Sequence, residues 1–273
     1  MIGGTLLAHT PTLEKLSIID GDGGTGPPEI PESTAVTQLL RLHTLSFQVD
    51  ECADILQYLI LPALKDLTIT LSDDEVWEAP LRSLLARSKC PLRKLHFGLM
   101  DWAPARVLEA LLASVRLPSV QDLTIRAPDG ADDAIGDLFR FMGDTSLLPA
   151  LESLTIAECE FHVSLPALVE MLQSRMRSEI EGTAKLTSFA LSFGPGSGYR
   201  KGREICHYQT FAVDDALDAL RKLCAQGLKM DIQSEFDQLG ENIDLKMVRS
   251  FPNLGLALTS ISVQIETIRG ELV

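Results

Sequence analysis

Leu61-Pro-Ala-Leu64-Lys-Asp-Leu67-Thr-Ile69 is the stretch that decides the fold, because similar copies of its last six residues, Leu64–Ile69, occur along the whole chain. The phrase Leu-x-x-Leu-x-Ile/Phe recurs at intervals of 22 to 39 residues, usually just after a proline. Its strong and weak copies begin at Leu13, Leu42, Leu64, Leu92, Val120, Leu151, Leu186, Ala225 and Leu258. A recurring phrase of this kind indicates an architecture built by stacking similar units.

The residues within and between the copies follow two different periods. Within each copy apolar and polar residues alternate, which is typical of a strand with one buried face. Between the copies apolar residues lie three and four positions apart, which predicts helices over 54–60, 104–112, 132–142, 165–172 and 213–223. Ser72 and Glu75 have capping-box spacing and mark a further helix start. The helices are expected to end before Pro62, Pro91, Pro118 and Pro149.

This alternation predicts an α/β fold in which parallel strands line the concave face and helices the convex face of one curved solenoid. We expect a single domain over residues 1–273, a leucine-rich-repeat-like horseshoe. The later copies are more widely spaced than such repeats usually are, so the repeats are expected to be irregular.

Composition restricts the classes of partner. The chain has 24 basic and 38 acidic residues and a net charge of −14, which would repel a phosphate backbone or an anionic membrane. We therefore expect neither nucleic acid nor membrane as a partner. The five cysteines have no C-x-x-C spacing, and the start of the sequence does not resemble a signal peptide. These features predict a cytoplasmic or nuclear protein.

No motif for catalysis, a metal or a cofactor stands out. Gly21, Gly23 and Gly26 fit G-x-G-x-x-G, but Pro27 and Pro28 follow where a dinucleotide site needs a helix to begin. The histidines never have the H-x-x-x-H spacing of a zinc site. We therefore expect a protein that is not an enzyme and has no cofactor or metal.

The outward side chains of the predicted strands are the candidate partner-binding residues. Equivalent positions stack about 4.8 Å apart in a parallel sheet, so they form rows. The candidates are Lys15, Asp66, Lys94 and Asp122 in one row, Ser46, Thr68, His96 and Thr124 in the next, and Arg126 at the end of a strand. A basic loop adds Tyr199, Arg200, Lys201 and Arg203. The alternatives are that exposed threonines simply suit strands and that the loop is a solvated insertion.

The repeats resemble those of a known family. Phrases such as Leu61–Ile69 and Leu148–Ile156, together with Ser88-Lys-Cys90-Pro-Leu92 after a short predicted helix, are similar to the leucine-rich-repeat region of F-box proteins of mushroom-forming fungi. The similarity covers nearly the whole chain. It implies a protein-binding module that recognises targets for a cullin-type ubiquitin ligase, with a Skp-type adaptor bound through an F-box.

The F-box itself is not visible in the sequence, which departs from the family here. The first copy of the phrase begins at Leu13, and no F-box-like helical segment is recognisable. The chain is therefore expected to be either the target-binding part of such a ligase subunit or a free-standing leucine-rich-repeat scaffold unrelated to ubiquitination. No adaptor-binding residue can be carried over from the family.

Overall fold

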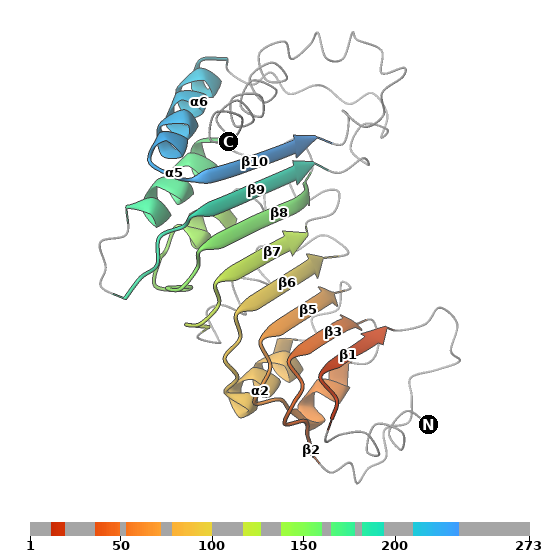
Figure 1. Cartoon of the computed structure of the whole chain (residues 1–273). Coiled ribbons are helices and arrows are strands. Elements are labelled where there is room, and N and C mark those ends of the chain that lie inside the picture. The colour runs from red at the N-terminus through yellow and green to blue at the C-terminus, as the bar shows by residue number, and fades with distance from the viewer. Residues whose placement is uncertain are drawn as a thin grey trace, which may run out of the picture.

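A large parallel sheet dominates the computed structural model, which describes residues 12–19, 36–49, 53–71, 78–99, 117–126, 138–159, 165–177, 182–193 and 210–234. The sheet has eight strands in the order β1-β3-β5-β6-β7-β8-β9-β10. Their bounds are Lys15–Ile19, Thr44–Val49, Asp66–Leu71, Lys94–Leu99, Asp122–Arg126, Ser153–Cys159, Ser188–Phe193 and Lys229–Ser234. Each of these strands lies beside the one that precedes it in the chain, and all arrows point the same way (Figure 1).

The recurring phrase forms these strands, as the sequence predicts. Eight of its copies lie on the eight strands in order, and the copy at Leu258 lies outside the described residues. From β1 to β9 neighbouring copies pair residue by residue, for example Leu67 with Leu95 and Leu95 with Leu123. The copy placed at Ala225 is two residues out of register, because Met230 and Ile232 of β10 pair with Phe189 and Leu191. The register shifts only between β8 and β9, after Ile156. The repeat therefore sets the order of all eight strands and the register of the first seven.

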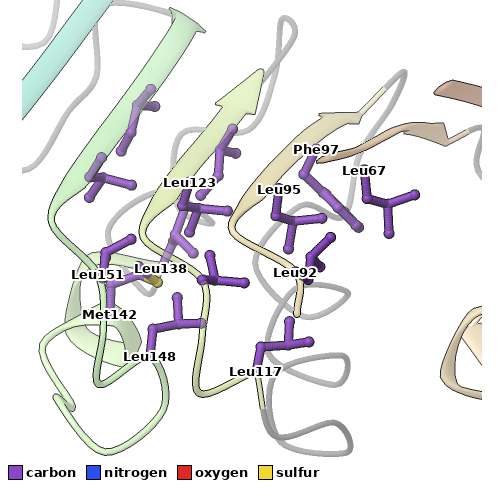
Figure 2. Packing of buried hydrophobic residues seen from close by; sticks show 14 of the residues in the cluster. Leu67, Leu92, Leu95, Phe97, Leu117, Leu123, Leu138, Met142, Leu148 and Leu151 are labelled. Carbon is purple, nitrogen blue, oxygen red and sulfur yellow. The ribbon is translucent and has the colours of Figure 1, made fainter. Parts of the chain in front are cut away.

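One face of the sheet forms the core. The two apolar strand positions of the phrase, such as Leu95 and Phe97 in β6, are almost completely buried in β3 and in β5 to β9. In β1, at the edge of the sheet, Leu16 and Ile18 are half-buried. The buried strand residues belong to one cluster with residues of the helices, among them Leu84, Leu138, Met142 and Leu168. Figure 2 shows Leu123 beside Leu95, with Leu138 and Met142 from the helical turn at residues 138–142 below the strands. The described helices therefore cover the apolar face of the sheet.

The proline before several strands forms a tight turn. In Leu61-Pro-Ala-Leu64 the amide of Leu64 donates to the carbonyl of Leu61, at 3.2 Å. The same bond joins Val120 to Leu117 across Pro118, at 3.4 Å, and Leu151 to Leu148 across Pro149, at 3.2 Å. Proline suits the second position of such a turn because its φ is already set there. The repeated Leu-Pro-x-Leu thus turns the chain into each strand.

The residue before each strand links the units. The carbonyl of Arg93 accepts the amides of Gln121 and Asp122, at 2.8 and 3.0 Å. The carbonyl of Gln121 likewise accepts the amides of Glu152 and Ser153, both at 2.9 Å. These pairs of hydrogen bonds to one carbonyl make neighbouring strands begin in register, so that equivalent side chains lie in rows.

The helices follow the predictions in part. α2 (Glu78–Ser88), α5 (Leu165–Met176) and α6 (Thr210–Ala225) form, and residues 138–142 are helical. α5 and α6 agree with the helices predicted over 165–172 and 213–223. The helix predicted over 104–112 and the capping box Ser72–Glu75 lie outside the described residues.

The prediction of an α-helix over 54–60 is wrong in its detail. Residues Ala53–Tyr58 form the 3₁₀ helix η1, and the next two residues form the short strand β4 (Leu59–Ile60). β4 pairs in parallel with β2 (Thr37–Gln38) in a second, two-stranded sheet. The copies at Leu42 and Leu64 are the closest in the sequence, with their first residues only 22 positions apart. A 3₁₀ turn of this length fits such a short connection.

Arginines near the ends of two helices bind the preceding unit. Arg175 of α5 is completely buried and donates to the carbonyls of Met142, Asp144 and Leu148, at 2.7, 2.9 and 2.9 Å. Burial lowers the pKa of Arg175 to about 10, partly opposed by the nearby Asp144 carboxylate, so the guanidinium remains charged at neutral pH. Arg87 of α2 makes a similar but less extensive contact with the preceding unit, in which its Nη2 donates to the carbonyl oxygen of Leu56 at 3.0 Å.

Candidate functional site

The outward side chains of the eight strands form what we call the polar face of the sheet. Its first row begins the strands and runs Lys15, Thr44, Asp66, Lys94, Asp122, Ser153, Ser188 and Lys229. Its second row runs Ser17, Ser46, Thr68, His96, Thr124, Thr155, Ala190 and Asp231. All of these side chains are half-buried or exposed, whereas their neighbours within each strand are mostly buried.

The structure brings together the site residues predicted on the strands. Lys15, Asp66, Lys94 and Asp122 share the first row, and Ser46, Thr68, His96 and Thr124 share the second. Arg126 ends β7 one step further along the same face and is exposed. The loop residues Tyr199, Arg200, Lys201 and Arg203 lie outside the described residues.

The first row alternates in charge across the three neighbouring strands β5, β6 and β7. Lys94 stands between Asp66 and Asp122 in register, and its Nζ lies 3.7 Å from Oδ2 of Asp122. Both side chains are well exposed, at 53% and 40%. An exposed pair of this kind contributes less than about 1 kcal/mol. The pair therefore helps to set the register and leaves both charges open to competition from a partner.

A third row widens the polar face toward the ends of the strands. Arg126 is flanked in register by two residues with little or no side chain, Gly98 on β6 and Ala157 on β8. A Cβ added at Gly98 would lie 3.2 Å from Oγ1 of Thr70, so the space beside this glycine is already closely packed. A side chain at Gly98 would therefore require the Thr70 side chain to move slightly.

Sequence reasoning missed the contribution of the last described strand. Lys229 and Asp231 of β10 are exposed and extend the two rows by one strand. The copy of the phrase predicted at Ala225 begins two residues too early: Met230 and Ile232 occupy the anchor positions, so Lys229 lies in the first row and Asp231 in the second.

The polar face differs in charge from the chain as a whole. Its described charged residues are the cationic Lys15, Lys94, Arg126 and Lys229 and the anionic Asp66, Asp122 and Asp231. This face is close to neutral although the chain carries −14. Most of the excess negative charge therefore lies elsewhere, and the face can accept polar groups of either sign.

Among the described residues, no group of three or more histidine, cysteine, aspartate or glutamate side chains is placed to hold a metal ion. Burial raises the pKa of the Cys90 and Cys224 thiols, which keeps both protonated at neutral pH. A thiol in this state is the opposite of an activated nucleophile. No helix in the described ranges is long and apolar enough to span a membrane.

Comparison with known proteins adds no assignment. No protein-family model matches the chain, and no curated protein matches it in sequence. The resemblance to F-box proteins therefore rests on the repeated phrases alone, and the geometry of the polar face is the main guide to function.

Proposed function

We propose that this chain is a non-catalytic protein-binding module that recognises its partner on the polar face and the adjoining loops. The observation that carries the proposal is the continuity of this face over eight strands in fixed register. About half of the side chains in its two rows are short hydroxyls, and nearly as many carry charges of both signs, so a partner can find specific hydrogen bonds and ion pairs there.

The finer form of the proposal is a leucine-rich-repeat horseshoe, with the polar face concave and the helices on the convex side. Parallel strands in sequential order with helices packed on one face support this shape, because helices are wider than strands and bend a stacked array away from themselves. From the resemblance of its repeated phrases to those of F-box proteins, we propose that the module serves as the target-recognition region of an F-box-type ubiquitin ligase subunit in the cytoplasm or nucleus.

Two matched variants test the polar face as the binding surface. Thr124→Arg places a long cation in the second row between His96 and Thr155. Glu170→Arg places the same side chain on an exposed position of α5, in the helical layer. Each variant is tagged and purified with its partners from native cells, after thermal melting has shown that it is folded.

We expect Thr124→Arg to lose a partner that the unmodified chain and Glu170→Arg both retain. Retention of every partner by folded Thr124→Arg would overturn the assignment of the polar face. Recovery of a Skp-type adaptor and a cullin with the full-length gene product would support the ligase role. A partner recovered in stoichiometric amount without them would support a free-standing scaffold instead.

A further inference from the structure

Positive charge is concentrated where the chain enters β3, β5 and β6, and we call this cluster the basic rim. It consists of Arg41 before β3, Lys65 before β5, and Lys89, Arg93 and Lys94 before and at the start of β6. All five side chains are exposed. Because the strands all point the same way, the rim lies at one end of the sheet (Figure 1). Such a concentration of cations stands out in a chain with a net charge of −14.

Backbone hydrogen bonds fix two of these cations on adjacent units. The amide of Arg93 donates to the carbonyl of Lys65 at 2.8 Å, and the amide of Lys65 donates to the carbonyl of His43 at 2.9 Å. The residue directly before the strand is therefore equivalent in successive units, about 4.8 Å apart. Like charges at equivalent positions of neighbouring strands are destabilising. An anion that contacts both Lys65 and Arg93 removes this repulsion.

The described part of the chain supplies little negative charge to the rim. At the position before each strand, successive units have Glu14, His43, Lys65, Arg93, Gln121 and Glu152. Each glutamate is two units, roughly 10 Å, from the nearest of these cations. Within the described ranges Lys94 is the one rim cation with an ion-pair partner, Asp122. Asp66 adjoins the rim, but one of its carboxylate oxygens is buried. The five cations thus outnumber the two carboxylates beside them.

The backbone at Lys89 is a separate sign that charge is needed here. Lys89 follows α2 with a φ of 45°, the left-handed region that glycine usually occupies at the end of a helix. The hydroxyl of Ser88 accepts the amide of Leu61 at 3.0 Å, which places Lys89 beside the turn that leads to Lys65. A lysine in this conformation costs stability that a glycine would not, and such strain is typical of functional positions.

We propose that the basic rim binds an acidic segment of the protein that the polar face recognises, with carboxylates of that segment against Lys65 and Arg93. The inference rests on the proposed function and specifies the partner of the same region. A short acidic segment of a protein is favoured over nucleic acid, because the net charge of −14 repels a long polyanion. Screening by salt limits the interactions of a short segment to the cations within about 8 Å.

Three short peptides of equal length test the proposal on the full chain. They alternate serine with glutamate, with glutamine or with lysine, and binding is followed by backbone amide shifts in NMR spectra. We expect the glutamate peptide alone to shift the amides of Lys65, Arg93 and their neighbours. The absence of these shifts would overturn the proposal, and so would tighter binding of a single-stranded DNA of equal charge at the same residues.

Two matched variants separate the rim from general attraction. Lys65→Gln should weaken binding of the glutamate peptide about fourfold, within the range of an exposed ion pair. Lys222→Gln removes an exposed lysine from α6, which leads into β10, four strands beyond β6. This control should leave the affinity within about twofold. Equal losses in the two variants would mean non-specific attraction and would overturn the site.

Lys89→Gly gives an independent test in which stability and binding change in opposite directions. Glycine relieves the backbone strain, so the variant should unfold at the same or a higher denaturant concentration. The loss of the cation should weaken binding of the glutamate peptide about threefold. Unchanged affinity would contradict the proposed rim. If the peptide tests fail while Thr124→Arg still loses its native partner, the polar face remains the binding surface and only the basic rim is wrong.

Discussion

The two faces of the sheet are built from the same strands, but their side chains have different roles. On the packed side Leu123 is 1% exposed and lies in register between Leu95 and Leu154, under the helical layer. On the polar side the next residue, Thr124, is only half-buried and lies between His96 and Thr155. The comparison indicates that stability is concentrated on one side of each strand, which leaves the other side available for recognition.

The packed side also holds a charge, and its loss should have the largest effect. Arg175→Ala leaves the carbonyls of Met142, Asp144 and Leu148 without their donor. Hydrogen bonds to a charged donor contribute about 1.5–3 kcal/mol each and do not add fully, so we expect a loss of roughly 3–5 kcal/mol. Chemical denaturation measures this loss.

Arg87→Ala serves as the comparison for Arg175→Ala. Arg87 is half-buried and its Nε has no hydrogen-bond partner, so its removal should destabilise the chain less, by about 1–2 kcal/mol. A larger loss at Arg87 than at Arg175 would show that burial does not determine the strength of these contacts.

Leu123→Ala tests the apolar packing itself. The change removes a buried side chain from the centre of the core and leaves a cavity between two neighbouring strands. We expect the free energy of unfolding to fall by about 2–5 kcal/mol, with neighbouring units losing protection against amide hydrogen exchange. Denaturant titration together with hydrogen exchange provides the measurement.

Thr124→Ala tests the opposite side of the same strand. Its hydroxyl is on the polar face, so the loss of stability should be under about 1 kcal/mol in the same denaturant titration. Similar losses for Leu123→Ala and Thr124→Ala would contradict the assignment of the two faces.

The smallest effect should come from pH. Hydrogen bonds from the hydroxyl and amide of Ser146 hold the pKa of Asp144 below its usual value, with a smaller contribution from Arg175. The folded state therefore binds this proton less tightly than the unfolded state, so the carboxylate stabilises the fold above about pH 4 and loses its effect as pH falls through the lowered pKa. Because Asp144 is exposed, the effect should be under about 1 kcal/mol.

Asp144→Asn checks this small effect. The variant should be slightly less stable than the unmodified chain at neutral pH and equally stable in acid, as measured by denaturant titration at several pH values. A constant difference at all pH values would show that ionisation of Asp144 is not its cause.

Much of the fold follows from short-range patterns. Alternation within the phrase identified the strands and their buried residues, and the repeat itself placed Asp66, Lys94 and Asp122 in one row. The 3₁₀ helix and β4 were not predicted, because residues 54–60 have apolar spacing that suits a helix and only the short connection forces a tighter path. The contacts of Arg175 were also not predicted, since its carbonyl partners lie 27 to 33 residues earlier in the chain.

The sequence by itself determined the parallel strands, their order and the two faces, because each of these follows from a period of two residues repeated at intervals along the chain. Only the tertiary structure decided which charges pair. Lys94 has an aspartate on either side in register, and in the folded chain its Nζ lies 3.7 Å from Oδ2 of Asp122. Such choices depend on distances between side chains of different units, which no local pattern encodes.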